Sequence, residues 1–268
     1  MAGPIRVTVC GALGRMGQRI IQAVLSRPEQ MILSGLVERP GHPQIGQNVG
    51  PQVGADQIDL KLAEALAPGS DVYIDFTSIE SSLAYAEQAA ALGLAGVIGT
   101  TGLSAEQKSR LAEFGCRVPL FWAPNMSTGV NALYKVVADL TRALGPDFDI
   151  EIVEAHHRLK KDAPSGTALR LQETIARARN LDPAQSRVSG RDGLVGERTK
   201  DEIGVLALRG GDIVGDHSIY FCGPGERLEV IHRAHSRDTF AEGAARAALW
   251  LAGRAPGLYG FEDMMKVD

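Results

Sequence analysis

The chain has 268 residues, of which 44% are hydrophobic and 22% are charged, and its formal net charge at pH 7 is −4. This length leaves room for one large domain or two modest ones with an ample core. The negative net charge and the lack of a lysine- or arginine-rich run argue against a surface that binds nucleic acid. The longest apolar run, residues 89–98, is too short to span a membrane, and no signal peptide is recognised, so we expect a cytoplasmic protein.

The three cysteines, Cys10, Cys116 and Cys222, are far apart and form no CxxC pair. We therefore predict three buried free thiols in a reducing compartment, not disulfides or a zinc site. No HxH, HExxH or paired-carboxylate pattern points to another metal.

The first predicted strand, residues 5–10, runs into the glycine loop Gly11-Ala-Leu-Gly14-Arg-Met-Gly17, which a helical pattern follows. GxxGxxG is a variant of the dinucleotide-binding fingerprint. Its first glycine permits a tight turn, its second lets the backbone approach a pyrophosphate, and its third packs the helix on the strand. The motif is weak by itself, but a strand before it and a helix after it are the context that it requires.

A second strand is predicted over residues 31–37 and ends at Glu38-Arg39. A carboxylate at this position accepts hydrogen bonds from the adenine ribose hydroxyls and favours NAD. Arg39, or Arg15 in the glycine loop, would instead meet the 2′-phosphate of NADP. The pair predicts use of both NADH and NADPH, and the alternative is a surface Glu-Arg dipeptide at a strand end.

Strands and helices alternate up to residue 126. Strands are predicted at 71–77, 95–99 and 118–122, helices at 79–92 and from Ser104 onward, and a mobile loop at 41–54. The alternation predicts a doubly wound parallel sheet of the Rossmann type. Ligands of such sheets lie beyond the carboxyl ends of the strands, so residues 75–77 and 99–101 are candidates for lining the nicotinamide side.

Beyond a helix that ends near residue 144, the pattern becomes rich in strands. Strands are predicted at 149–155, 203–208, 213–222 and 227–234, with a helix at 167–179, a long loop at 182–201 and hairpin turns at 210–212 and 223–225. This pattern predicts an α+β domain on a mixed or antiparallel sheet, whose outer face needs cover and favours self-association.

A last predicted helix, residues 239–252, is expected to pack back onto the first domain. The predicted domains are therefore residues 1–126 plus 239–268 for dinucleotide binding, and residues 127–238 for substrate binding and oligomerisation.

A strongly basic stretch follows the strand at 149–155. We expect that strand to place Ile150 and Ile152 on one face and Glu151 and Glu154 on the other. Two histidines and three cations come next, and a helix then begins; these residues are His156, His157, Arg158, Lys160, Lys161, Ser165, Gly166 and Thr167. A helix N-terminus favours a carboxylate or phosphate, so the stretch predicts a pocket for an anionic substrate with proton donors at hand. Alone, the basic loop would be a solvated surface loop and the serine a simple helix cap.

The remaining histidines carry no such pattern. We interpret His42, His217, His232 and His235 as surface or packing residues.

The run Glu-Ala-His-His-Arg-x-Lys-x-Asp-Ala-Pro-Ser-Gly-Thr-Ala at 154–168 resembles the signature of the dihydrodipicolinate reductases. The resemblance extends to residues 11–17, 38–39, 75–77, 97–102 and 209–215. It implies NAD(P)H-dependent reduction of a cyclic dicarboxylate, 4-hydroxy-tetrahydrodipicolinate, to tetrahydrodipicolinate with loss of water, in diaminopimelate and lysine biosynthesis. It also implies a homotetramer assembled through the sheet of the second domain.

The resemblance further implies roles for single residues. His156 corresponds to the catalytic proton donor and acceptor, Lys160 to a second proton donor and substrate ligand, and His157 to a substrate-binding residue. Ser165, Gly166 and Thr167 would hold a substrate carboxylate, the last two through their main-chain amides. The residues expected to contact NADH or NADPH are Gly11, Ala12, Leu13, Gly14, Arg15, Met16, Glu38, Arg39, Gly99, Thr100, Thr101, Ala123, Pro124, Asn125 and Met126.

Two other functions remain open at this stage. One is a different two-domain NAD(P) oxidoreductase acting on an amino acid, such as an aspartate or homoserine dehydrogenase, because a nucleotide-binding domain does not fix the substrate. The other is a non-enzymatic NAD(H)-sensing regulator, which would need a DNA- or partner-binding surface that the acidic composition does not favour.

Overall fold

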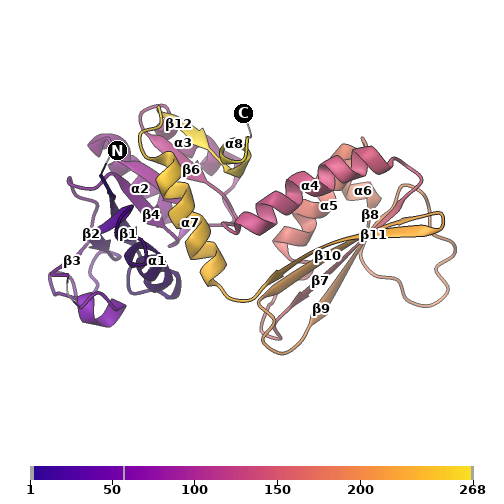
Figure 1. Ribbon diagram of the computed structural model, residues 1–268, viewed down its shortest axis with the longest axis horizontal. Helices are drawn as coiled ribbons and strands as arrows, with labels where there is room; N and C mark the ends of the chain where they lie inside the picture. The colour runs from indigo at the N-terminus through magenta and orange to yellow at the C-terminus, as the bar shows by residue number, and fades with distance from the viewer. Residues whose placement is uncertain (1–2, 57, 267–268) are drawn as a thin grey trace. The chain divides into compact units, whose positions relative to one another are not determined.

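The computed structural model describes residues 3–56 and 58–266 (Figure 1). It divides into two compact units, residues 1–127 with 238–268 and residues 128–237. Within the described ranges, no helix has both the length and the apolar character needed to cross a membrane.

The first unit is built on a seven-stranded parallel sheet with the order β12-β6-β5-β4-β1-β2-β3. Its strands are β1 (Ile5–Cys10), β2 (Met31–Val37), β3 (Leu62–Ala63), β4 (Val72–Asp75), β5 (Ala95–Ile98), β6 (Pro119–Trp122) and β12 (Gly257–Tyr259). The chain adds strands first on one side of β1 and then on the other. In doubly wound folds such a switch point opens a crevice at the carboxyl ends of the strands.

Helices cover both faces of this sheet. Helices α1 (Arg15–Leu25) and α7 (Asp238–Leu251) lie on one face, and α2 (Ile79–Leu92) and α3 (Ala105–Gly115) lie on the other (Figure 1). The side of α7 that meets α1 and the sheet is almost entirely alanine, which lets the elements approach closely. The helix start expected at Ser104 is confirmed, because Ser104 and Gln107 form a capping box at the start of α3. The 3₁₀ helix η1 (Gly50–Val53) and the short α8 (Phe261–Met264) belong to the same unit.

The glycine loop adopts the conformation that its sequence predicts. Gly11 has a φ of +65°, a left-handed value that favours glycine. A β-carbon on Gly17 would lie 2.0 Å from the Gly11 carbonyl oxygen. The third glycine is therefore needed for α1 to lie against the loop.

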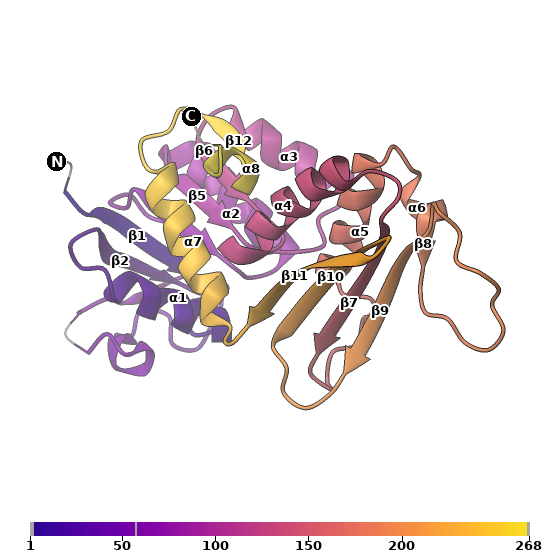
Figure 2. The same cartoon turned by 45° about the vertical axis from the view of Figure 1, so that its right-hand side comes forward.

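The second unit is a five-stranded mixed sheet with the order β11-β10-β7-β9-β8 (Figure 2). Its strands are β7 (Asp149–His156), β8 (Arg187–Val188), β9 (Ile203–Arg209), β10 (Gly215–Gly223) and β11 (Glu226–Ala234). Helices α4 (Thr128–Leu144) and α5 (Gly166–Ala178) pack on one face and close a core of aliphatic side chains. A short helix, α6 (Pro183–Ser186), follows α5.

The other face of this sheet carries a different set of side chains. Glu151, Val153 and Ala155 alternate with the buried residues of β7, so they face away from the helices. Leu208 of β9 is registered with Ala155 and is 58% exposed, and Ile231 of β11 is 41% exposed. This outer face therefore presents large apolar side chains to solvent.

The turn expected at residues 210–212 does not join a hairpin, so that prediction was wrong. Strand β9 pairs with β7 in parallel and β10 pairs with β7 antiparallel, so residues 210–214 pass over the carboxyl end of β7. The amide of Gly210 donates to the His156 carbonyl at 2.9 Å, and the Gly211 carbonyl accepts from the Arg158 amide at 3.2 Å. A local glycine signal marks a turn but does not show that another strand lies between its two arms.

Several short elements were not predicted. Strands β3 and β12 extend the parallel sheet at its edges, η1 lies within the expected loop at 41–54, and α6 and β8 open the expected loop at 182–201. Two- and three-residue strands are too short for alternation to be visible in the sequence.

The prediction of three buried thiols is correct only for Cys10. Cys222 is partly exposed and Cys116 is exposed. Cys116 follows α3 as its C-cap, where the chain turns toward β6 at the surface.

Candidate functional site

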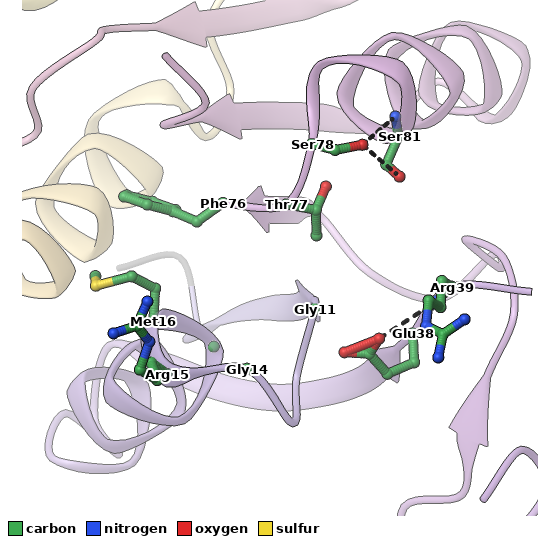
Figure 3. Close-up of a pocket in the computed structure, with 11 residues that line it drawn as sticks. Gly11, Gly14, Arg15, Met16, Glu38, Arg39, Phe76, Thr77, Ser78 and Ser81 are labelled. Carbon is green, nitrogen blue, oxygen red and sulfur yellow. Dashed lines mark hydrogen bonds between the residues drawn. The ribbon is translucent and has the colours of Figure 1, made fainter. Parts of the chain in front are cut away.

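A cavity of about 430 Å³ lies beyond the carboxyl ends of β1, β2 and β4 in the first unit (Figure 3). Its size falls in the usual range for pockets that hold small molecules and cofactors. The walls are the glycine loop, the end of β2 and the segment after β4, with the lining residues Gly11, Gly14, Arg15, Met16, Gly17, Glu38, Arg39, Phe76, Thr77, Ser78 and Ser81.

The glycine loop provides a site for a phosphate group. Gly14 is the N-cap of α1 and offers no side chain, so no cap competes for the amides that open the helix. These amides and the partial positive charge of the helix N-terminus suit a pyrophosphate. A β-carbon on Gly11 would lie 2.8 Å from the Thr77 methyl group. Thr77 thus packs against the loop, and Figure 3 draws its side chain above Gly11.

Glu38 and Arg39 lie together at one end of the pocket (Figure 3). A Glu38 carboxylate oxygen accepts a hydrogen bond from the Arg39 amide at 3.1 Å. The carboxylate suits ribose hydroxyls and the guanidinium suits a phosphate. The structure therefore brings both predicted ribose-side residues to the glycine loop.

The other predicted cofactor residues do not line this cavity. Ala12 is buried and Leu13 packs against the core of the unit. The segments that follow β5 and β6 lie at the carboxyl edge of the same parallel sheet, and they hold Gly99, Thr100, Thr101, Ala123, Pro124, Asn125 and Met126. Contact of these residues with a cofactor stays a prediction.

Sequence reasoning missed Ser78 and Ser81 as pocket residues. Ser78 caps α2, and its hydroxyl oxygen accepts from the Ser81 amide at 3.2 Å. The signal was available: a serine between a buried strand and an apolar helix marks a helix start at the ligand-binding edge.

Asp75 lies behind this pocket at the end of β4 and is completely buried. One carboxylate oxygen accepts from the Thr77 amide at 3.0 Å and from the Thr77 hydroxyl at 2.5 Å. The other oxygen accepts from the Ser82 hydroxyl, whose oxygen is 2.7 Å from the Thr100 hydroxyl. Ser82 has a single proton, so it donates to Asp75 and accepts from Thr100. Burial raises the pKa of Asp75 above its ordinary value, and the hydrogen bonds from Ser82 and Thr77 offset only part of that effect.

The second unit has its own polar cluster at the end of β7. Burial alternates strictly along this strand, so Glu154 and His156 share the inward face with Ile150 and Ile152. The expectation that Glu154 lies on the opposite face was wrong, because residues 150, 152 and 154 differ by multiples of two and must share a face. A carboxylate at this position lies under the helices, not in solvent.

Glu154 is fully buried and accepts four hydrogen bonds. Arg209 binds it with both terminal nitrogens, at 2.7 and 2.8 Å. His156 Nδ1 lies 2.7 Å from one oxygen and the Ser165 amide 2.9 Å from the other. Burial alone would raise the pKa of Glu154, but the hydrogen bonds from Arg209, His156 and Ser165 outweigh it, and the pKa is below its ordinary value.

Two opposing effects act on the pKa of His156. Burial lowers its pKa, and the contact with Glu154 raises it by less, so the pKa remains below the ordinary value. The nearby charges of Lys160 and Arg209 lower it further. At neutral pH the imidazole is therefore uncharged.

His217 is buried beside His156, with ring centroids 5.3 Å apart and the rings nearly perpendicular. Burial lowers the pKa of His217 to about 3, and the neighbouring His156 contributes. Its Nε2 is 3.1 Å from the Ser165 hydroxyl. The interpretation of His217 as a packing residue is correct, but the sequence did not show that it packs against His156.

Helix α5 begins within this cluster. Ser165 is its N-cap and accepts from the Ala168 amide at 3.2 Å, while Gly166 and Thr167 form its first turn. The Lys160 ammonium group is 2.9 Å from an Asp162 carboxylate oxygen. A cation, a histidine and a helix N-terminus thus occur together, and their role as an anion-binding pocket stays a prediction. The buried Nδ1 of His157, the remaining predicted ligand, has no hydrogen-bond partner in the part of the chain that the structure describes.

Comparison with known proteins gives a consistent result over the whole chain. The family models for the N-terminus and the C-terminus of dihydrodipicolinate reductase match residues 5–126 and 129–265. The chain is 48% identical over 264 residues to a 4-hydroxy-tetrahydrodipicolinate reductase of Geotalea uraniireducens and 49% identical over 264 residues to one of Trichlorobacter lovleyi. Each alignment covers 97% of this chain and 98% of the relative.

A solved structure supports the fold. The dipicolinate-bound dihydrodipicolinate reductase from Paenisporosarcina sp. TG-14 has a TM-score of 0.75 to this chain at 23% sequence identity. The match covers 98% of this chain and 100% of that one, and at this identity it shows a shared fold.

Proposed function

Because the chain belongs to the dihydrodipicolinate reductase family, it reduces 4-hydroxy-tetrahydrodipicolinate to tetrahydrodipicolinate with a pyridine nucleotide, and we propose that its two clusters divide this work. The reaction loses water and belongs to diaminopimelate and lysine biosynthesis. Neither the amino-acid dehydrogenase nor the NAD(H)-sensing regulator agrees with this membership.

The pocket of the first unit is the proposed cofactor site. The amides of the loop at 11–16 and the start of α1 would hold the pyrophosphate, and residues 99–101 and 123–126 would continue the site along the sheet edge. The bound pyridine nucleotide supplies the hydride. The residues fit this group because the loop offers uncapped helix amides beside a cavity of suitable size.

We propose that the enzyme uses both NADH and NADPH. Glu38 supplies an acceptor for the ribose hydroxyls of NADH, while Arg39 and Arg15 supply guanidinium groups for the 2′-phosphate of NADPH. All three side chains line the same pocket, which supports dual use.

The cluster at the start of α5 is the proposed substrate site. Lys160 and His157 would bind one carboxylate of the ring, and Ser165, Gly166 and Thr167 would bind the other. The observation that carries this assignment is the position of His156 beside Lys160 and the N-terminus of α5, because this combines groups that attract an anion with an imidazole that can exchange a proton.

His156 is the proposed proton donor, with Lys160 as the second. A dicarboxylate bound beside His156 would offset the positive charges of Lys160 and Arg209 and favour the imidazolium form. The imidazolium would then donate a proton as negative charge develops on the ring nitrogen system. A positioned general acid contributes roughly 100- to 10,000-fold to such a step.

The outer face of the second sheet is the proposed contact between copies of the chain in a homotetramer. Its exposed Leu208 and Ile231 gain from burial against a second copy. An Ile231→Glu variant should sediment as a smaller species than the unaltered chain, and an unchanged tetramer would contradict this assignment. We also place the enzyme in the cytoplasm, the usual location of soluble amino-acid biosynthesis.

The test of these roles is a coupled assay in which a synthase makes the substrate from pyruvate and aspartate semialdehyde, and loss of reduced-nicotinamide absorbance is followed with NADH and NADPH in parallel. We expect oxidation of both. His156→Gln should lower kcat by roughly 100-fold or more, with little change in nucleotide KM. Full turnover in this variant or in Lys160→Ala would rule out the corresponding role.

A further inference from the structure

We propose that Glu154 is a positioning residue for the reaction: it fixes His156 as the Nδ1–H tautomer and leaves Nε2 to exchange the proton with substrate, while Gly215 keeps the space beside Nε2 open. The inference rests on the proposed role of His156. It deepens that role by assigning which ring nitrogen acts and what holds it in place.

The hydrogen bonds of Glu154 determine the tautomer. Arg209 and the Ser165 amide are donors only, and they occupy both carboxylate oxygens. An ionised carboxylate has no proton to offer, so the contact of 2.7 Å with His156 requires that Nδ1 carry the hydrogen. The four acceptor positions of the carboxylate are then filled.

Arg209 links Glu154 to the loop that carries Lys160 and Asp162. Besides its two bonds to Glu154, the guanidinium donates to the Asp162 carbonyl at 2.6 Å. Asp162 is also the ion-pair partner of Lys160. Movement of Glu154 would therefore disturb both His156 and the loop that carries Lys160.

The opposite edge of the His156 ring faces Gly215. A β-carbon on Gly215 would lie 3.1 Å from Nε2 and 3.4 Å from the adjacent ring carbon. Gly215 has no left-handed φ, so its backbone conformation does not demand glycine. The missing side chain instead leaves room beside Nε2, for which the described residues provide no hydrogen-bond partner.

The other charged or titratable groups near His156 do not determine the tautomer. Lys160 and Arg209 act on the ring through their charge, and His217 meets it edge-on at 5.3 Å. Glu154 is the group that contacts a ring nitrogen. A carboxylate so placed orients the imidazole and stabilises the imidazolium when it forms.

Nuclear magnetic resonance tests the tautomer in the unaltered full-length enzyme. With histidine labelled by ¹⁵N in the ring and His156→Gln used for assignment, we expect Nδ1 of His156 to be protonated and Nε2 unprotonated at neutral pH. Glu154→Gln should lose this preference. A wild-type ring protonated at Nε2 alone would overturn the proposal.

Kinetics separate positioning from a general structural role. Glu154→Gln should lower kcat by roughly 100-fold, the low end of what a positioned general acid contributes, and it should cause little further loss in a His156→Gln background, because Glu154 acts through His156. An equal loss of kcat in both backgrounds would show a purely structural role and contradict the proposal. If His156→Gln itself kept full turnover, the proposed function of His156 would fail first.

Gly215→Ala provides a second variant that leaves the Glu154 network intact. Its methyl group should crowd Nε2 and lower kcat by roughly 10-fold while nucleotide KM stays unchanged. Gly210→Ala is the matched control, because a β-carbon there would meet nothing within 4 Å and that glycine has no left-handed φ. Equal kcat in the two glycine variants would rule out the role of Gly215.

Discussion

Each unit completely buries one carboxylate next to its candidate site, yet the two are stabilised in opposite ways. Asp75 is held by the hydroxyls of Thr77 and Ser82 and by the Thr77 amide. Glu154 is held by the guanidinium of Arg209, by a histidine and by an amide. Burial raises the pKa of Asp75, whereas the donors of Glu154 outweigh the same effect and its pKa is lowered.

The difference shows that burial alone does not set the charge of a carboxylate. A hydroxyl group can either donate or accept a hydrogen bond, so the Asp75 network accommodates a neutral side chain. The guanidinium and the amide at Glu154 can only donate, so that network requires an acceptor at both oxygens. One site thus tolerates loss of charge and the other does not.

The largest expected effect is on stability. In Asp75→Asn the new amide can donate to Ser82, which then donates to Thr100, and we expect a change of less than about 1 kcal/mol. In Glu154→Gln the amide would face the donors of Arg209 or Ser165, and breaking such a buried pair costs about 3–5 kcal/mol. Thermal unfolding should show a melting temperature lower by roughly 10 °C for Glu154→Gln alone.

Replacement of both partners provides a control for this comparison. Glu154→Met with Arg209→Met should recover much of the loss, because it leaves no unpaired buried charge. Equal destabilisation by Asp75→Asn and Glu154→Gln would show that the two networks are equivalent.

The second prediction concerns the pH dependence of stability, which should have opposite signs at the two sites. The pKa of Asp75 is raised in the folded state, so its contribution is full below the ordinary value of 3.8 and is lost as pH rises through the folded pKa. The pKa of Glu154 is lowered, so its contribution is present above the ordinary value of 4.5 and is lost as pH falls through the folded pKa.

Melting curves across pH therefore distinguish the two carboxylates. Asp75→Asn should gain in melting temperature relative to the unaltered chain as pH rises through the Asp75 titration. The deficit of Glu154→Gln should shrink in acid, once Glu154 itself is protonated. Parallel curves for all three proteins would contradict both assignments.

A third, smaller effect concerns nucleotide binding by Glu38 and Arg39, the charged side chains at one end of the first unit's pocket. Glu38→Gln should raise the KM for NADH by roughly tenfold and Arg39→Gln the KM for NADPH by a similar factor, since each removes one charge-assisted hydrogen bond. Unfolding should change by less than about 0.5 kcal/mol in either variant. Initial rates with each nucleotide, and a melting curve, provide the measurements; a joint change in both KM values would argue against separate roles.

The smallest expected effect is at Asp162, whose side chain is 61% exposed. In Asp162→Asn the Lys160 ammonium no longer has a competing carboxylate, so substrate KM should fall by about two- to fivefold, within the range of an exposed ion pair. Stability should stay unchanged. A raised KM would instead indicate that Asp162 holds Lys160 in its binding position.

Local patterns predicted the elements that are long enough to show them. The strand and glycine loop at 5–17 and the helix at 79–92 were visible because burial imposes periods of 2 and 3.6 on the sequence. The three-residue β12 has no such pattern, and its place beside β6 is fixed by tertiary packing.

The polar cluster at the end of β7 was predicted only in part, for a related reason. His156 and Lys160 belong to one continuous run, but Arg209 and His217 reach the same place from other strands. These residues come together because β7 lies between β9 and β10 in the sheet. No local sequence pattern indicates that strand order. Glu154 could have been placed from the sequence, because strict alternation along β7 puts it on the buried face, although the sequence analysis assigned it to the opposite face.

The return of α7 to the first unit also bears on how the protein is made. This helix packs on α1 and the sheet, yet it is translated after the whole of the second unit. At about 5–20 residues per second, the ribosome needs roughly 5 to 20 s to synthesise the intervening segment. During that interval the nascent first unit exposes the apolar surface that α7 later covers, while the contiguous second unit can complete its own fold. The segment made first is thus finished last, and chaperones have an extended period in which to bind it.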